Sequence, residues 1–167
     1  SEPEYRMIID EKPESMYTYD DMESDLKRLS EKYKNILTLN TLTQTADNRY
    51  VYDAVAGNPN SENQYIITAS IHAREYITTK LTMKLLIDFL EDYSGNDVLF
   101  HFIPMVNPDG VSISQLGEKG IKNTDVLNKI TEIARSDGKT INDSNYLRQW
   151  KANANGVDLN RNFDALW

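Results

Sequence analysis

Cysteine is absent from this sequence of 167 residues, and its absence excludes several kinds of chemistry at once. A chain without thiols forms no disulfide bond, binds no metal through thiolates and has no cysteine nucleophile. Any metal ion would therefore be held by histidine and carboxylate side chains.

Long hydrophobic runs and dense positive charge are missing as well. No apolar run approaches the ~20 residues of a membrane-spanning helix, so we expect no transmembrane segment. The net charge is −8, and no cluster of lysine and arginine is dense enough to follow a phosphate backbone, so we expect no nucleic-acid partner. The start, Ser1-Glu-Pro-Glu4, is neither basic nor apolar and does not resemble a signal peptide, although a processed start would look the same.

The composition is that of a globular protein, with 40% apolar and 26% charged residues. A domain of this length buries roughly 70% of the surface of its unfolded chain, which is enough for a core. Residues 1–17 carry little periodicity and several charges, so we predict an irregular N-terminal arm there. The sequence contains no internal repeat and no low-complexity segment.

Hydrophobic periodicity predicts one helix and a hairpin after the arm. Thr18 is a suitable N-cap for the helix. Its buried stripe is predicted to consist of residues at helical spacing, namely Met22, Leu26, Leu29 and Tyr33. Residues 38–44 and 50–56 are rich in β-branched or aromatic residues and flank a polar turn at 46–49, which predicts two paired strands.

The rest of the predicted sheet is built around residues 64–76. This stretch begins as a buried strand at 65–71 and is followed by a helix at 77–92. The helix is expected to pack against the sheet through its apolar residues Leu81, Met83, Leu85, Leu86, Ile87, Phe89 and Leu90. Residues 98–106 are almost entirely apolar, as in a strand covered on both faces, so strand, helix and strand form one crossover unit.

The later part of the chain is more polar. Asn107-Pro-Asp-Gly110 is predicted to be a turn that ends its strand on the same side as His72. Residues 111–145 are mixed, with one short helix predicted at 125–134, and a connection of this length is typical of binding loops or a lid. Residues 146–163 are dense in Asn, Arg and Asp.

His72 and Glu75 are the first candidates for a metal site, because they end a strand just before a helix. At this spacing an imidazole nitrogen and a carboxylate oxygen can both reach one zinc ion at ~2 Å. The alternative is a solvated or capping pair, since a His-x-x-Glu spacing also arises by chance. A hydrolytic zinc site needs three protein ligands and a group that accepts a proton from water, and the sequence offers no evident third ligand.

Two other candidates have simpler interpretations. His101 lies inside an apolar strand, and we interpret it as a hydrogen-bonded histidine of the sheet. Asn160 and Arg161 offer an amide and a planar guanidinium that suit a free carboxylate. The alternative for this pair is a loop amide and a surface arginine.

Taken together, three short motifs resemble the zinc carboxypeptidase family, the carboxypeptidase A, B and T type of metallopeptidase. They are His72-Ala-Arg-Glu75 after one apolar strand, Asn107-Pro-Asp-Gly110 after the next, and Gly156-Val-Asp-Leu-Asn-Arg-Asn-Phe163 near the end. The resemblance covers the chain from about Thr18 onward. It implies an α/β fold with a mixed, twisted sheet and helices on both faces, and it makes residues 18–167 the N-terminal part of a catalytic domain.

The resemblance also implies a metal and its ligands. His72 and Glu75 would be the first two ligands of Zn2+, and Asp158 would accept a hydrogen bond from the histidine and fix its tautomer. The family's third ligand, a histidine, and its general-base glutamate lie beyond the position matched by Phe163. We therefore expect this chain to be truncated after the first half of the domain and inactive alone, so that the missing C-terminal half or a second copy would complete the site.

The residues implied for substrate binding lie in the same motifs. Arg74 would line a substrate subsite, and Asn160 with Arg161 would hold the C-terminal carboxylate of a peptide. In the family an arginine stabilises the oxyanion. Lys151 occupies that position here and keeps the charge without the bidentate fork, and Arg148 is a nearby substitute.

The implied activity is that of a zinc-dependent metallocarboxypeptidase acting near a free C-terminal carboxylate. Residues 150–160 are most similar to the bacterial branch that cleaves γ-D-glutamyl-diaminopimelate bonds in cell-wall peptides, so we expect an extracellular or cell-wall location. Whether the enzyme acts as an exopeptidase or an endopeptidase stays open. The alternative function is a catalytically inactive module that keeps the carboxylate-binding residues and binds peptide ends.

Overall fold

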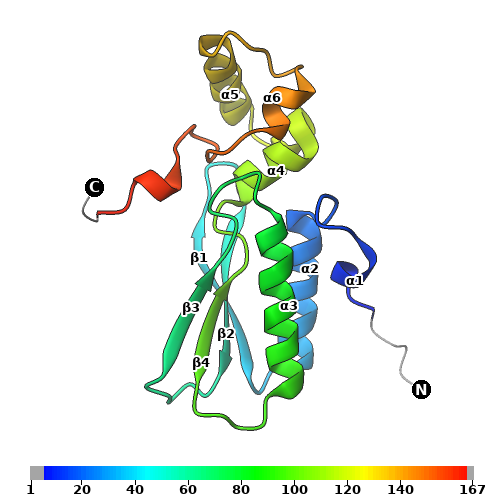
Figure 1. Ribbon diagram of the computed structural model, residues 1–167, viewed down its shortest axis with the longest axis vertical. Helices are drawn as coiled ribbons and strands as arrows, with labels where there is room; N and C mark the ends of the chain where they lie inside the picture. The colour runs from blue at the N-terminus through cyan, green and yellow to red at the C-terminus, as the bar shows by residue number, and fades with distance from the viewer. Residues whose placement is uncertain (1–5, 165–167) are drawn as a thin grey trace.

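The computed structural model describes residues 6–164 and has a four-stranded sheet with two long helices beside it and shorter helices at one end (Figure 1). In chain order the elements are α1 (Ile8–Glu11), α2 (Tyr19–Lys32), β1 (Leu37–Gln44), β2 (Tyr50–Gly57), β3 (Gln64–Thr68), α3 (Ile77–Asp92), β4 (Leu99–Ile103), α4 (Pro108–Leu116), the 3-10 helix η1 (Gly117–Gly120), α5 (Thr124–Ser136), α6 (Ser144–Arg148) and the 3-10 helix η2 (Leu159–Arg161). No helix within residues 6–164 is long and apolar enough to cross a membrane.

The sheet is mixed, with the strand order β1-β2-β4-β3. β2 pairs antiparallel with both β1 and β4, whereas β3 and β4 are parallel. α3 connects these two parallel strands, so the crossover unit predicted from the sequence is present. The predicted hairpin is also present, and a bulge between Thr41 and Thr43 shifts its register. These features confirm the expected α/β class.

α2 begins where the sequence predicts it. The Thr18 side chain accepts a hydrogen bond from the backbone N–H of Asp21 (3.3 Å), and the Asp21 carboxylate accepts one from the Thr18 N–H (3.0 Å). This reciprocal capping box satisfies donors that the first turn would otherwise leave unpaired. Met22, Leu26 and Leu29 are buried, as predicted, whereas Tyr33, the fourth residue of the predicted stripe, is the C-cap of α2 and only half-buried.

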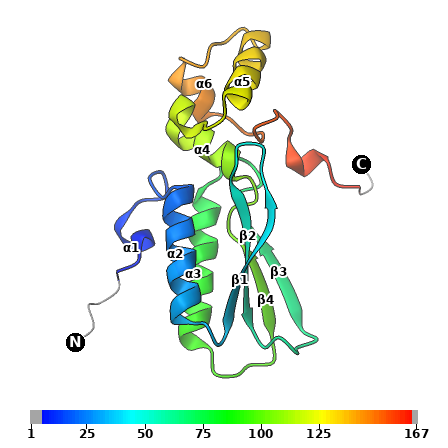
Figure 2. The ribbon, with the colours of Figure 1, turned by 180° about the vertical axis from the view of Figure 1, so that it is seen from behind.

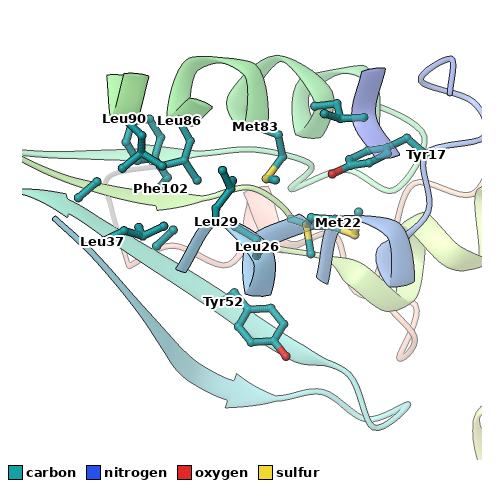
Figure 3. Packing of buried hydrophobic residues seen from close by; sticks show 14 of the residues in the cluster. Tyr17, Met22, Leu26, Leu29, Leu37, Tyr52, Met83, Leu86, Leu90 and Phe102 are labelled. Atoms are coloured by element: carbon teal, nitrogen blue, oxygen red, sulfur yellow. The ribbon is translucent and has the colours of Figure 1, made fainter. Parts of the chain in front are cut away.

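α2 and α3 pack on one face of the sheet and form the main core with it (Figure 3). The core joins side chains from both helices and three strands, including Met22, Leu26, Leu29, Leu37, Tyr52, Met83, Leu86, Leu90 and Phe102. Tyr52, Ala54 and Ala56 alternate along β2 and so point to this same face. Within residues 6–164, then, both long helices lie on one face, which differs from the expected helices on both faces, and α4, α5 and α6 lie beyond the end of the sheet (Figures 1 and 2).

The strand predicted at 65–71 is shorter and more exposed than expected. β3 is an edge strand, and Tyr65 and Ile66 are 54% and 71% exposed. β4 is only partly covered as well, since Phe102 is buried while Ile103 is half-buried. A run of apolar residues is typical of a buried strand, but it does not show which strands lie at the edge of the sheet.

The buried stripe of α3 also differs from the predicted one. The residues that the sheet and α2 cover are Thr79, Thr82, Met83, Leu86 and Leu90, whereas Leu81 and Leu85 are exposed. Apolar residues surround most of this helix, so periodicity does not identify the stripe that packs. Thr79 is buried because its hydroxyl donates a hydrogen bond to the carbonyl of Pro104 (2.6 Å).

The arm predicted to be irregular contains one helical turn, α1, which packs on α2. The buried carboxylate of Asp25 accepts hydrogen bonds from the N–H groups of Ile8 (3.0 Å) and Ile9 (2.9 Å) and from the hydroxyl of Tyr17 (3.0 Å). Ile9 and Tyr17 therefore join the main core. Residues 1–5 of the arm lie outside the described residues, and the boundary between arm and domain stays a prediction.

The predicted turn at 107–110 is instead the first turn of α4. Asn107 is the N-cap, and Pro108 takes the first helical position, where its missing N–H is not needed. Residues 111–145 were expected to be mostly loops, but they contain the rest of α4, η1, α5 and the start of α6. α5 confirms the one helix predicted there. These helices share a second core, which includes Ile113, Val126, Ile130, Leu147 and Trp150.

Candidate metal centre

The candidate site lies in the segment that connects β3 to α3. The Ala69 N–H donates to the Ile103 carbonyl (3.0 Å), so the segment stays beside β4 after the strand ends. Ser70 then adopts a left-handed backbone conformation with φ 52°, and its hydroxyl lies 2.6 Å from that of Thr79 in α3. This sharp turn places His72 at the carboxyl end of the parallel strands, the usual ligand position in α/β sheets.

His72 lies between two carboxylates. Its Nδ1 atom is 3.1 Å from each carboxylate oxygen of Glu75, and its Nε2 atom is 3.2 Å from Oδ1 of Asp158. The His72 side chain is 13% exposed and that of Glu75 is 49% exposed, so the imidazole is held inside while the carboxylate is open to solvent. If Nε2 carries the proton and donates a hydrogen bond to Asp158, the lone pair of Nδ1 faces the Glu75 oxygens.

Asp158 is also bound by the residues around it. Its Oδ2 atom accepts a hydrogen bond from Lys151 Nζ (2.9 Å), and its Oδ1 atom accepts one from the Asn160 N–H (3.1 Å). The hydrogen bond from the Lys151 ammonium lowers the pKa of Asp158 below its ordinary value and outweighs partial desolvation, with smaller contributions from Asn160 and His72. Asp158 is therefore an ionised acceptor for the histidine.

The residues predicted to bind substrate lie near this cluster and are open to solvent. Arg161 Nε is 3.8 Å from Oδ2 of Asp158, and the Arg161 side chain is 76% exposed. Asn160 is exposed beside it. Arg74 is exposed too, and its Nη1 atom donates to Oε1 of Gln149 (3.2 Å). The geometry leaves these side chains accessible, and their roles stay predictions.

The two candidates for oxyanion stabilisation are in different surroundings. Lys151 contacts Asp158 and so belongs to the His72 cluster. Arg148 lies in α6, where it lines a cavity formed with α4 and η1, and no hydrogen bond or ion pair within the described part of the chain joins it to Asp158. The structure thus brings Lys151 to the candidate site and does not bring Arg148 there.

The donor atoms fit zinc, but the set is incomplete. An imidazole nitrogen and a carboxylate are ordinary zinc ligands, and those of His72 and Glu75 face each other. Among residues 6–164, no group of three or more His, Cys, Asp or Glu side chains is arranged to hold a metal ion. His72 and Glu75 are therefore the candidate ligands among the described residues, and their role as zinc ligands stays a prediction.

The second histidine has a structural role. His101 Nδ1 lies 2.8 Å from Oδ2 of Asp53, which is on the neighbouring strand β2. The interpretation of His101 as a hydrogen-bonded histidine of the sheet is confirmed.

Sequence reasoning missed the residues that join the two segments of the site. The Ala73 N–H donates to the Lys151 carbonyl (3.0 Å). Asn107 Nδ2 donates to the carbonyls of Ile71 (3.2 Å) and Ala152 (3.1 Å). Asn107 stands in a recognisable motif, but the motif predicts only a local turn and gives no sign of a contact 45 residues away.

The fold and the paired donors define an α/β protein with a candidate metal centre at the carboxyl end of its parallel strands. The chain belongs to the zinc carboxypeptidase family, whose sequence model matches residues 22–167. The family consists of hydrolytic metallocarboxypeptidases, and zinc is its metal.

Curated relatives are of bacterial and animal origin. Gamma-D-glutamyl-L-diamino acid endopeptidase 1 of Lysinibacillus sphaericus is 32% identical over 164 residues, which cover 90% of this chain and 38% of the relative. Protein YqgT of Bacillus subtilis is 26% identical over 182 residues, covering 99% and 46%, and carboxypeptidase O of Bos taurus is 26% identical over 152 residues, covering 85% and 35%. The chain thus spans less than half the length of these relatives.

Solved structures support the fold. A chain in the complex of bovine thrombin-activatable fibrinolysis inhibitor with tick carboxypeptidase inhibitor is 18% identical and superposes with a TM-score of 0.66, covering 91% of this chain and 45% of that one. A metallo-carboxypeptidase from Burkholderia cenocepacia is 17% identical with a TM-score of 0.52, covering 86% and 33%. The expected carboxypeptidase-like fold is confirmed over part of the length of those chains.

Proposed function

We propose that this chain is the N-terminal part of a zinc-dependent metallocarboxypeptidase that hydrolyses peptide bonds near a free C-terminal carboxylate. The observation that carries the proposal is the position of His72 between Glu75 and Asp158. With Asp158 on one ring nitrogen, the other nitrogen and the Glu75 carboxylate are free to bind a common ion. Membership of the zinc carboxypeptidase family supports the same class of reaction.

His72 and Glu75 would hold the zinc ion. When bound, zinc supplies a Lewis acid for the scissile carbonyl and an activated water molecule. Asp158 would accept a hydrogen bond from the Nε2–H group of His72 and so favour the tautomer in which Nδ1 carries no proton. Lys151 supports this role, because its ammonium lowers the pKa of Asp158 and keeps that carboxylate ionised.

Lys151 is also proposed to stabilise the oxyanion. An ammonium group has three donors, and the hydrogen bond to Asp158 uses one of them. The Lys151 side chain is 39% exposed, so the other donors can reach a substrate oxygen. Arg148 is the less supported candidate, since it lies in α6 beside another cavity.

Asn160, Arg161 and Arg74 are proposed to bind the peptide. Arg161 is exposed next to Asp158, and a guanidinium fork matches a carboxylate with two parallel hydrogen bonds. We propose peptides of the cell wall as the substrate class and an extracellular or cell-wall location. The support is the name of the Lysinibacillus sphaericus relative, a gamma-D-glutamyl-L-diamino acid endopeptidase.

This chain alone is proposed to be inactive. It spans less than half the length of its relatives, and residues 6–164 hold only two candidate ligands. The C-terminal half or a second copy would supply the third ligand and the general base. The lack of a third ligand among the described residues also favours the alternative, a module that binds peptide ends without hydrolysis.

Zinc titration of three proteins tests the site. We expect wild type to bind about one zinc ion per chain, His72→Ala to lose this binding, and His101→Ala to keep it. His101 is the matched control, because it is the other of the two histidines and is bonded to Asp53. Equal zinc binding by wild type and His72→Ala would remove the basis of the proposal.

Hydrolysis is tested on a protein as long as the relatives. We expect this longer protein to release C-terminal residues from peptides, or to cleave γ-D-glutamyl peptides, only when zinc is present. A protein of that length that binds peptide carboxylates but cleaves neither substrate would establish the binding module instead.

A further inference from the structure

Asn107 occupies a buried position between the two segments that form the candidate metal centre. It is the N-cap of α4 and is only 2% exposed. Its backbone N–H donates to the Ser70 carbonyl (3.1 Å), and its Oδ1 atom accepts from the Gly110 N–H (3.0 Å). Because Oδ1 faces an N–H group, the Nδ2 end of the amide faces the opposite side, and the orientation of the carboxamide is defined.

The Nδ2 group of Asn107 donates to carbonyls from two distant parts of the chain. One is the carbonyl of Ile71 (3.2 Å), directly before the candidate zinc histidine, and the other is that of Ala152 (3.1 Å). The Ala73 N–H joins the same two segments by donating to the Lys151 carbonyl (3.0 Å). Both N–H hydrogens of the carboxamide are therefore used to connect backbone on the two sides of the site.

Gly110 provides the space for this arrangement. A Cβ atom at position 110 would lie 2.4 Å from the Ala152 carbonyl oxygen and 2.6 Å from Asn107 Nδ2. Packed interiors do not accommodate contacts this short, so the Ala152 segment and the carboxamide would have to move apart. Glycine is unfavourable inside a helix, and the close approach of Ala152 explains its presence in α4.

We propose that Asn107 is a positioning residue for the candidate metal centre, whose carboxamide holds the backbone around His72 in register with the backbone around Lys151. This inference rests on the proposed function, since it assigns Asn107 to a zinc site. His72 and Asp158 come from the two segments that Asn107 joins. If the hydrogen bonds of Asn107 Nδ2 are lost, the two segments can separate. The His72 imidazole then loses the acceptor that sets its tautomer, and zinc binds more weakly.

Two substitutions at Asn107 separate its donors from its role as a helix cap. Asn107→Asp keeps an acceptor for the Gly110 N–H but turns an oxygen toward two carbonyl oxygens, which repels both segments. Asn107→Ser is milder, because serine is a good N-cap, lacks the Nδ2 donors and introduces no charge. Asn123→Asp is the matched control, since Asn123 caps α5 by accepting from the Asp125 N–H (2.9 Å).

Hydrogen exchange of the Ala73 amide shows, without metal, whether its hydrogen bond to the Lys151 carbonyl is kept. Zinc titration then measures the effect on metal affinity. We expect both Asn107 variants to exchange Ala73 faster by roughly 10-fold or more and to bind zinc roughly 10-fold or more weakly. Asn123→Asp is expected to match wild type in both measurements. The Leu26 amide, in the core helix α2, is expected to keep its wild-type exchange rate in all variants that fold.

The proposal is overturned if Asn107→Ser folds and exchanges Ala73 at the wild-type rate, or if it binds zinc as tightly as wild type does. If Asn107→Asp does not fold, Asn107→Ser decides the question. If the wild-type chain binds no zinc, the titration is made on a protein as long as the relatives, and no zinc binding there contradicts the proposed function. The Ala73 exchange rate alone then decides whether Asn107 holds the two segments together.

Discussion

The Nε2 atom of His72 lies 3.2 Å from Oδ1 of Asp158, although 86 residues separate the two in the chain. His72 follows the edge strand β3, and Asp158 lies in the polar segment near the C-terminus. The other oxygen of Asp158 is bound by Lys151. A carboxylate held in this way stays ionised and can orient the imidazole, so in the proposed site Asp158 would connect the zinc ligand His72 to Lys151.

Asp158→Asn is expected to weaken zinc binding. The substitution removes the charge that stabilises the Nε2 proton of His72, and loss of such a partner typically costs about 10- to 100-fold in metal affinity. Calorimetric zinc titration is the measurement. Asp53→Asn is the matched control, because Asp53 binds the other histidine, and it is expected to retain wild-type affinity. Equal affinities for the two variants would contradict the role of Asp158.

Arg49→Met is expected to destabilise the fold. Arg49 is 4% exposed, and its Nη1 atom lies 2.8 Å from the Asp47 carboxylate and 3.2 Å from that of Asp109. Removing the cation leaves two buried carboxylates uncompensated, which costs roughly 3–5 kcal/mol in the free energy of unfolding. Urea denaturation measures this, with Arg135→Met as the control; Arg135 is exposed on α5, and this variant is expected within about 0.5 kcal/mol of wild type. Similar decreases in the free energy of unfolding for both variants would contradict a stabilising role for the ion pairs of Arg49 with Asp47 and Asp109.

Alkaline pH is expected to unfold the protein through its buried tyrosines. Burial raises the pKa of Tyr17, Tyr19 and Tyr52 far above the ordinary value, and Asp25 and Glu23 raise these pKa values further. The unfolded chain ionises its tyrosines near pH ~10, so the stability gained from keeping these three neutral is complete below that pH. It is lost as the pH rises further.

Tyrosinate absorbance and far-UV circular dichroism, recorded through one alkaline titration, check this expectation. The last tyrosines are expected to ionise together with the loss of helical signal. Tyr17→Phe is expected to make stability less sensitive to pH above ~10, because phenylalanine cannot ionise. Ionisation of all ten tyrosines with the fold retained would contradict the expectation.

The isolated chain is expected to self-associate through exposed apolar residues of the edge strand β3 and of α3. They are Tyr65 and Ile66 in β3 and Ile77, Leu81 and Leu85 in α3, all more than 40% exposed. An edge strand beside exposed apolar side chains favours pairing with another chain. Sedimentation at increasing concentration is expected to show larger species for wild type and fewer for Ile66→Lys or Leu81→Lys. Val157→Lys, which changes an exposed apolar residue elsewhere, is the control, and an equal effect there would contradict a specific surface.

Much of the fold follows from local chemistry that the sequence displays. Thr18 and Asp21 are close enough in the chain to form their capping box without help from the rest of the protein. The β1–β2 hairpin and the α3 crossover follow from residue type and spacing in the same way. Three short motifs in order were sufficient to predict the family.

Burial was less predictable, because it depends on which elements meet. The exposure of Ile66 follows from the position of β3 at the edge of the sheet, and the burial of Thr79 follows from a carbonyl that β4 places beside it. The contacts of His72 with Asp158, and of Asn107 with Ala152, join residues that are 86 and 45 positions apart. Such hydrogen bonds form only when separate segments are packed together, so local patterns do not show them. The contact of His72 with Asp158 was implied by the family resemblance, whereas nothing in the sequence indicated that of Asn107 with Ala152.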